Sequence, residues 1–151
     1  MGRTMARKLR MEYPGALYHV YSQGNYRDYV FREEGARKAF LTCLEEACKR
    51  SRWVLHAYVL MGNHYHLALE TPRGNLVEGM KWLQATFANR FNRFRSENGH
   101  VFQGRYQDGN RDTPIFWNTW LRWLRFSHLP FRCRRDGSIL RFSPQSISIG
   151  R

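Results

Sequence analysis

Two histidines separated by one residue are the part of this chain whose side chains could do chemistry. His64 and His66 lie in the stretch 58–71, YVLMGNHYHLALET, which alternates like a β-strand. Side chains two positions apart project from the same face of a strand, so the imidazoles are expected side by side, with Tyr65 pointing away. Neutral imidazoles are ligands for divalent metals, and this pair would need a further ligand or a substrate oxygen. The alternative is two partly exposed strand histidines without a ligand.

The elements that must position these histidines follow from the periodicity of the apolar residues. We expect strands over 16–23, 53–61 and 64–71, helices over 33–50 and 76–95, and a further extended piece over 100–107. Gly62-Asn63 is a two-residue hairpin signal, and a leading glycine favours a type II′ turn. This order predicts an α+β, ferredoxin-like (RRM-like) sandwich with two helices on one face of an antiparallel sheet. The second helix is expected to pack across the sheet near His64 and His66, where one of its side chains could share a site with them.

The composition indicates a folded protein with a polyanionic partner. The chain has 151 residues, a formal net charge of +13 and a pI near 10.4. This charge predicts a polyanionic partner, and nucleic acid is the expected one. A membrane surface is the weaker alternative, because no apolar segment approaches the length of a transmembrane helix. Cys43, Cys48 and Cys133 have no metal-binding spacing, and the basic N-terminus lacks the apolar region of a secretory signal, so we expect a cytoplasmic protein with no membrane association.

Basic and aromatic residues alternate late in the second expected helix and after it. Such a surface can neutralise phosphates and stack unpaired bases, although a solvated helix face with ordinary core aromatics has the same pattern. The candidate nucleic-acid contacts are Arg90, Arg93, Arg105 and Tyr106, with Arg27 in the turn after the first strand as a weaker candidate.

Four blocks of the sequence resemble the REP-associated tyrosine transposases, the single-tyrosine HUH transposases of the insertion-sequence type. The blocks are ALYHVYSQGNYRDYVF, HAYVLMGNHYHLALETP, MKWLQATFANRFNRF and GHVFQGRYQ. The resemblance implies a ferredoxin-like fold, single-stranded hairpin DNA as substrate, Mg²⁺ or Mn²⁺ bound by His64 and His66, and a homodimer. It also implies strand cleavage and rejoining through a 5′-phosphotyrosine, in which the metal polarises the attacked phosphate.

The chain departs from this family at the expected nucleophile. The resemblance places the tyrosine at Phe87, which has no oxygen with which to attack phosphorus. The third metal ligand is expected one turn later, at Phe91, with Asn92 and Gln84 as nearby substitutes. Tyr106 could in principle replace the nucleophile, although it is not on the helix.

The C-terminal part departs from the family as well. We expect a transposase-like HUH domain over 1–107 and a divergent, irregular, basic segment over 108–151. The stretch FSHLPFR over 126–132 resembles a damaged family motif. The stretch over 117–126 is rich in Trp and Arg, and the end over 141–151 is rich in Ser. An out-of-frame reading of the ancestral gene is one hypothesis for this composition.

Three functions remain open from the sequence. The first is a transposase-like, metal-dependent DNA-processing protein. The second is a catalytically inactive hairpin-DNA binder, which Phe87 favours. The third is an RNA-binding module, since the same sandwich can stack bases on its sheet, but no RNP1-type pattern is present to support it.

Overall fold

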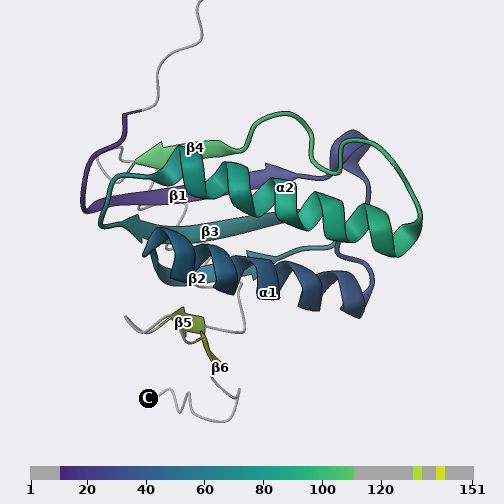
Figure 1. Cartoon of the computed structure of the whole chain (residues 1–151), viewed down its shortest axis with the longest axis horizontal. Helices are drawn as coiled ribbons and strands as arrows, with labels where there is room; N and C mark the ends of the chain where they lie inside the picture. Colours follow the sequence, from purple (N-terminus) through teal and green to yellow (C-terminus); the bar gives the residue numbers. More distant parts are fainter. Residues whose placement is uncertain (1–10, 111–130, 134–138, 142–151) are drawn as a thin grey trace, which may run out of the picture.

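The predicted ferredoxin-like sandwich is the fold that the chain forms. The computed structural model describes residues 11–110, 131–133 and 139–141. Its elements are β1 (Ala16–Gln23), the short 3-10 turn η1 (Asn25–Arg27), α1 (Glu34–Ser51), β2 (Val54–Leu60), β3 (His64–Thr71), α2 (Leu76–Arg95), β4 (Gln107–Asn110), β5 (Phe131–Cys133) and β6 (Ile139–Arg141). The first four strands form one antiparallel sheet in the order β2-β3-β1-β4. Both helices lie on the same side of this sheet (Figure 1).

The histidine strand β3 lies between β1 and β2, as expected. The β2–β3 hairpin closes through a hydrogen bond from the Met61 N–H to the His64 carbonyl at 2.8 Å. The predicted type II′ turn is wrong, because neither Gly62 nor Asn63 has a positive φ. The turn is instead held by its neighbours: the N–H of Phe31 donates to the Gly62 carbonyl at 2.9 Å, and the N–H of Gly24 donates to the Asn63 carbonyl at 2.8 Å.

Apolar side chains at helical spacing build the core between the sheet and the helices. They come from α1 at Ala36, Phe40, Cys43, Leu44 and Ala47, and from α2 at Leu76, Met80, Leu83, Phe87 and Phe91. The apolar stripe predicted for α2 ends one turn earlier than expected, because the Phe94 side chain is 72% exposed. The sheet contributes the alternate residues of β3, Tyr65, Leu67 and Leu69, which are all fully buried.

The start of α2 is fixed against the end of α1 by two part-buried hydrogen bonds. The Trp53 indole N–H donates to Asn75 Oδ1 at 3.1 Å, and Asn75 Nδ2 donates to the Ser51 carbonyl at 3.0 Å. Gly79 lies so close to this indole that an added Cβ would overlap a ring carbon of Trp53. A helical glycine costs up to about 1 kcal/mol relative to alanine, but only glycine fits here without displacing the tryptophan.

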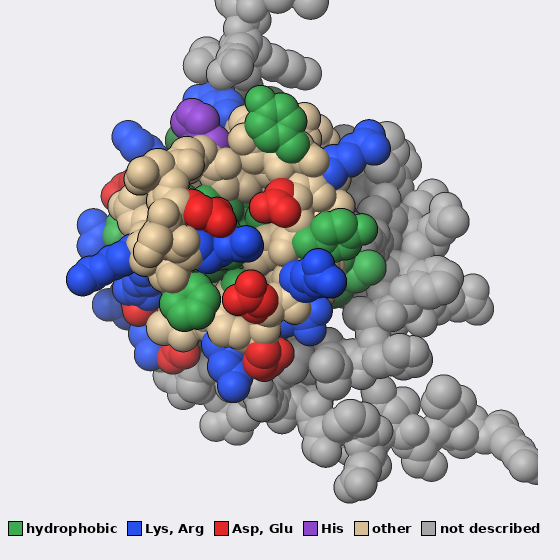
Figure 2. Space-filling view, turned by 90° about the vertical axis from the view of Figure 1, so that its right-hand side faces the viewer, with side chains coloured by type: hydrophobic (Ala, Val, Ile, Leu, Met, Phe, Trp, Pro, Cys, Tyr) green, Lys and Arg blue, Asp and Glu red, His purple; other side chains and the backbone are tan. Residues whose placement is uncertain are grey.

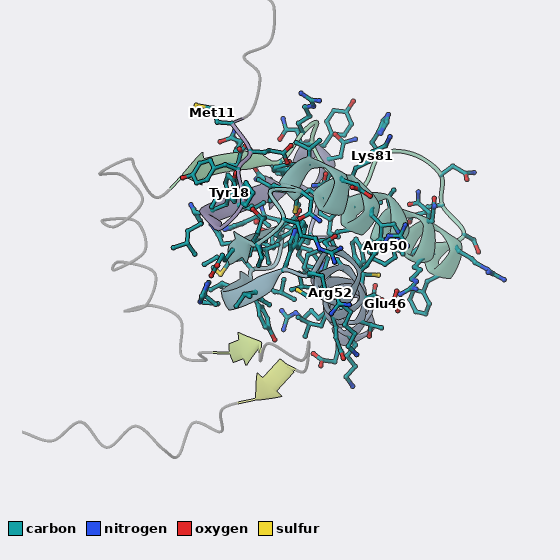
Figure 3. The ribbon with its side chains drawn as sticks, turned by 60° about the vertical axis from the view of Figure 1, so that its left-hand side comes forward. Met11, Tyr18, Glu46, Arg50, Arg52 and Lys81 are labelled. Atoms are coloured by element: carbon teal, nitrogen blue, oxygen red, sulfur yellow. The ribbon has the colours of Figure 1, made fainter. Side chains whose placement is uncertain are left out.

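Two further contacts attach the periphery to this core (Figure 3). The guanidinium of Arg50 on α1 lies 5.8 Å from the centroid of the Trp82 ring on α2. The Tyr18 hydroxyl on β1 donates to the Met11 carbonyl at 2.9 Å, which ties the residues before the sheet to its first strand. These contacts join α1 to α2 and the segment around Met11 to β1.

The fourth strand begins where the predicted extended piece ends. Residues 100–106 form only an isolated bridge between Phe102 and Gly24, and β4 then pairs with β1 over Gln107–Asn110. The predicted domain boundary after residue 107 therefore falls inside a strand of the sheet. Beyond it, β5 and β6 form a separate antiparallel pair. The expectations for 111–130, including most of the FSHLPFR stretch, and for 142–151 lie outside the described residues. No helix in the described part is long and apolar enough to span a membrane.

Candidate metal and nucleic-acid site

The alternation of β3 decides on which face of the sheet the two histidines lie. Tyr65 is fully buried and contacts the Phe40 ring of α1 at 4.7 Å between centroids, so it points toward the helices. His64 and His66 flank Tyr65 and therefore project from the opposite side of the sheet. We call this opposite side, which carries His64, His66 and their strand neighbours, the histidine face.

Strand β1 places two more rings on the histidine face. Tyr21 pairs directly with His66, and His19 pairs with Ala68, the next residue on the same face of β3. The ring centroid of Tyr21 is 4.8 Å from that of His66 and 5.7 Å from that of His64. The His64 and His66 centroids are themselves 5.2 Å apart. The structure thus brings the predicted pair together and surrounds it with aromatic rings.

Each histidine of the pair has a hydrogen-bonding partner at its Nδ1 atom. His64 Nδ1 lies 2.6 Å from Asn63 Oδ1, and because an amide oxygen only accepts, His64 donates from Nδ1. This tautomer puts the lone pair of His64 on Nε2, the nitrogen that can coordinate a cation. His66 Nδ1 lies 2.9 Å from His19 Nε2 on the neighbouring strand.

The histidines of this face are held in their neutral state. Burial, together with the adjacent His19 and His64, lowers the pKa of His66 from 6.5 to about 3. Burial also lowers the pKa of His19 and that of His64. A neutral imidazole keeps a lone pair for a metal ion, whereas a protonated one does not. At neutral pH the pair is therefore in the chemical state that a ligand requires.

The pair is not part of a larger ligand cluster in the described residues. Within residues 11–110, no group of three or more His, Cys, Asp or Glu side chains is arranged to hold a metal ion. A cation bound by His64 and His66 would need oxygen ligands from a substrate or from water. Two protein ligands leave coordination positions open, whereas a structural metal site is closed by four protein ligands.

The structure separates Phe87 from the histidine pair. Its ring is fully buried among Phe31, Phe40, Phe91 and Phe102, with centroids between 5.2 and 5.8 Å away. This cluster lies between the helices and the sheet, so the structure places Phe87 of α2 on the side of the sheet opposite His64 and His66. The physical reason is the apolar alternation of β3, which turns Tyr65 and not the histidines toward α2.

The suggested substitute ligands also lie on the helix side. Gln84 Nε2 donates to Ser22 Oγ at 3.1 Å and to the Tyr65 hydroxyl at 3.0 Å. Asn92 Nδ2 donates to the Gly99 carbonyl at 2.9 Å, beyond the end of the sheet. Burial raises the pKa of the Tyr65 hydroxyl, so this phenol stays protonated and inaccessible. The third ligand that the resemblance implies is therefore not supplied by Gln84, Phe91 or Asn92 in this arrangement.

The five residues predicted to contact DNA differ in exposure and in their partners. Arg90 forms a two-bond fork with Glu46 of α1, at 3.1 and 2.9 Å, and its guanidinium also lies 3.2 Å from Cys43 Sγ. Tyr106 is buried. Arg27, Arg93 and Arg105 are exposed. The exposed three are available to phosphates, whereas Arg90 is already engaged with a carboxylate.

The turn η1 adds an aromatic surface beside the histidine strand. Tyr26 and Arg27 both have left-handed backbones, with φ of 50° and 60°, and the Tyr26 side chain is 93% exposed. The preceding Gly24 bonds to the hairpin at Asn63, so the turn lies next to His64. Non-glycine residues in this strained region cluster at functional sites. An exposed aromatic and a cation on one strained turn can stack a base and contact its phosphate.

A pocket of about 380 Å³ lies between this turn and the end of α2. It is lined by Asn25 and Tyr26 from the turn, Phe91 and Asn92 from α2, and the loop 97–101. Figure 2 views the molecule toward this end and shows Lys and Arg side chains interspersed with Asp and Glu. The surface charge is mixed here, so the positive charge of the whole chain is not concentrated at this end.

Sequence reasoning missed His19, Tyr21 and Tyr26. His19 and Tyr21 have the same two-residue spacing as His64 and His66, within the predicted strand 16–23. Pairing that strand with the histidine strand would have placed them on the same face, but the register is not readable from one sequence. Nothing in the sequence distinguishes Tyr26 from the other tyrosines before its exposure is known.

Comparison with known proteins gives one family and a shared fold. A family model described as "Transposase IS200 like" matches residues 12–110. A solved REP-associated tyrosine transposase bound to a REP hairpin superposes with a TM-score of 0.64 and 11% identity, covering 82% of this chain and 75% of that chain. A candidate transposase from Deinococcus radiodurans gives a TM-score of 0.57 and 19% identity, covering 80% and 97%. No curated protein sequence matches the chain significantly.

Proposed function

Because the chain belongs to the IS200-like transposase family, we propose that it is a transposase-like protein that binds single-stranded hairpin DNA on its histidine face. The observation that carries this proposal is the placement of neutral His64 and His66 together on the sheet face opposite both helices. The hairpin named for the structural relative and the net charge of +13 support DNA as the partner.

His64 and His66 are the residues that would hold a Mg²⁺ or Mn²⁺ ion. The donor set fits weakly by itself, since hard cations prefer oxygen and two imidazoles offer none. Binding should therefore strengthen when a DNA phosphate supplies oxygens to the same ion. When bound, the ion supplies Lewis-acid polarisation of that phosphate. The histidines contribute position and neutral lone pairs, and the sheet fixes their spacing.

The turn η1 would hold the nucleic acid beside this pair. Tyr26 offers an exposed ring for one unpaired base, and Arg27 offers a cation for the adjacent phosphate. Stacking of this kind is independent of base identity, because every base has a π-face. Arg93 and Arg105 would extend the phosphate contacts away from the turn.

We further propose that this copy holds DNA without cutting it. Phe87 has no hydroxyl and is buried on the helix side of the sheet, away from the histidine pair. The hydroxyl-bearing rings of Tyr65 and Tyr106 are buried as well. Tyr21 is the tyrosine beside the histidines, and its hydroxyl donates to Gln23 Oε1 at 3.2 Å. It is the position to examine first if covalent chemistry is found.

Two wider features of this chain remain proposals. One is assembly as a homodimer. The other is a division into an HUH domain and a divergent C-terminal segment, with the boundary moved beyond β4 to include its last residue, Asn110.

The proposed partner is tested by comparing ligands of one length. Fluorescence anisotropy with a hairpin DNA, a duplex DNA and an RNA hairpin should give tightest binding to the hairpin DNA, with affinity falling steeply as salt rises. Equal affinity for duplex and hairpin would refute recognition of single-stranded features. A preference for the RNA hairpin would favour the RNA-binding alternative.

A further inference from the structure

His66 meets a third histidine edge to edge. The ring planes of His19 and His66 differ by only 7°, and their centroids are 5.1 Å apart. His19 Nε2 and His66 Nδ1 are much closer, at 2.9 Å, so the rings meet through these nitrogens and not face to face. This separation is that of a hydrogen bond between two ring nitrogens. One of the two atoms must therefore carry a hydrogen and the other a lone pair.

The direction of this hydrogen bond decides whether His66 can bind a metal. If His66 donates from Nδ1, its lone pair is on Nε2. If His19 donates from Nε2, His66 accepts at Nδ1 and carries its hydrogen on Nε2, which then cannot coordinate. His64 already donates from its Nδ1, because Asn63 Oδ1 can only accept a hydrogen bond. The lone pair of His64 is therefore on Nε2.

We propose that His19 is a positioning residue that accepts a hydrogen bond from His66 Nδ1 and thereby presents His66 Nε2 to a metal ion. Asn63 has the same role for His64. Each histidine would therefore bind the metal through Nε2, while a different residue accepts the hydrogen bond from its Nδ1. Metal-binding histidines generally donate their other ring N–H in this way, which fixes the tautomer and the ring orientation. The inference rests on the metal site of the proposed function.

The pairing of β1 with β3 places His19 beside His66. His19 is on the central strand β1, two residues before Tyr21, which pairs with His66. The side chain is half-buried. A rigid neighbouring strand can hold the His66 ring more firmly than a loop residue could.

The test uses the full chain, three variants and two readouts. His19→Phe keeps a ring and removes the acceptor, His19→Gln restores a polar atom near the position of Nε2, and His66→Ala removes the ligand itself. The first readout is the ¹⁵N NMR tautomer of His66 in metal-free protein. The second is the affinity for Mn²⁺ alone, measured by calorimetry.

We expect His66 in the Nδ1–H form in the native protein, and the Nε2–H form, which histidine favours in water, in His19→Phe. We expect Mn²⁺ affinity to fall about 10- to 100-fold in His19→Phe and to recover in His19→Gln. An unchanged tautomer and unchanged affinity in His19→Phe would overturn the proposal. Equal losses in His19→Gln, His19→Phe and His66→Ala would also overturn it, because they would make His19 a ligand.

Failure of the metal site is distinguishable from failure of this inference. If the native protein binds no Mn²⁺, the proposed metal site is wrong, and the tautomer readout alone decides the role of His19. A native His66 in the Nε2–H form would then overturn the positioning role. Thermal unfolding of each variant confirms that its fold is retained.

Discussion

At the scale of single residues, this chain has a histidine pair on one face of its sheet and a phenylalanine at the expected nucleophile position on the other. His64 and His66 are neutral, adjacent and backed by Asn63 and His19. Phe87 occupies the expected nucleophile position and is an ordinary core residue. The pair was predictable, because the two-residue spacing in a strand fixes its members on one face. Their supporting partners were not, because they depend on strand register and side-chain rotamers.

The pair should be required for metal binding. We expect the His64→Ala, His66→Ala double variant to bind Mn²⁺ at least about ten-fold more weakly than the native protein in calorimetry with hairpin DNA present. His100→Ala is the matched control, because His100 is exposed and lies in the loop after α2. Equal Mn²⁺ binding by the double variant would show that the cation binds elsewhere.

The lowered pKa of His66 also predicts how stability depends on pH. Its pKa falls from 6.5 to about 3 on folding, so between these values the unfolded chain binds more protons than the folded one. The free energy of unfolding of the metal-free protein should therefore decrease as the pH falls from 6.5 toward 3. Urea unfolding at several pH values measures this. His66→Gln should show a shallower dependence, and an identical slope would contradict the assignment.

At the scale of elements, the sequence predicted the helices and the first three strands within one residue of their ends. Periodicity succeeded there because each element has one apolar face against a common core. It failed for β4, whose residues QDGN carry no strand pattern and pair only because β1 offers an edge. The placement of α2 over Tyr65 was readable in principle, since Tyr65, Leu67 and Leu69 are the apolar alternation of β3.

The turn η1 should contribute affinity for unpaired bases. Tyr26→Ala is expected to weaken hairpin binding by about 1–3 kcal/mol, the range for one stacked base, or about 5- to 150-fold in Kd. Tyr13→Ala serves as the control, because Tyr13 precedes β1 at the opposite end of the sheet. Equal effects of the two substitutions in an anisotropy titration would argue against stacking at the turn.

The arginines of α2 and the following loop should differ in how their substitution changes the salt dependence of DNA binding. Arg93→Ala with Arg105→Ala should flatten the dependence of log K on log salt by about one unit per lost phosphate contact. Arg90→Ala should leave that slope nearly unchanged and reduce stability by less than about 1 kcal/mol, since its fork with Glu46 is partly exposed. A slope that flattens in Arg90→Ala would show that DNA displaces Glu46.

At the scale of the whole molecule, the architecture of the family is combined with a phenylalanine at the expected nucleophile position. The family match ends at residue 110, where β4 ends, so the recognisable part of the chain coincides with the sheet and its two helices. The residues beyond it carry the Trp- and Arg-rich stretch whose out-of-frame origin remains a hypothesis. The coding DNA around codons 107–133 would test that origin, because a shifted frame would restore a family-like sequence.

The central claim is that the protein holds hairpin DNA at its histidine face and forms no covalent bond to it. The most direct measurement incubates the native chain with labelled hairpin DNA and Mn²⁺ and divides the sample between a native and a denaturing gel. We expect a shifted complex on the native gel and free DNA on the denaturing gel. A denaturation-resistant adduct would contradict the central claim, and loss of that adduct in Tyr21→Phe or in Tyr106→Phe would identify the nucleophile.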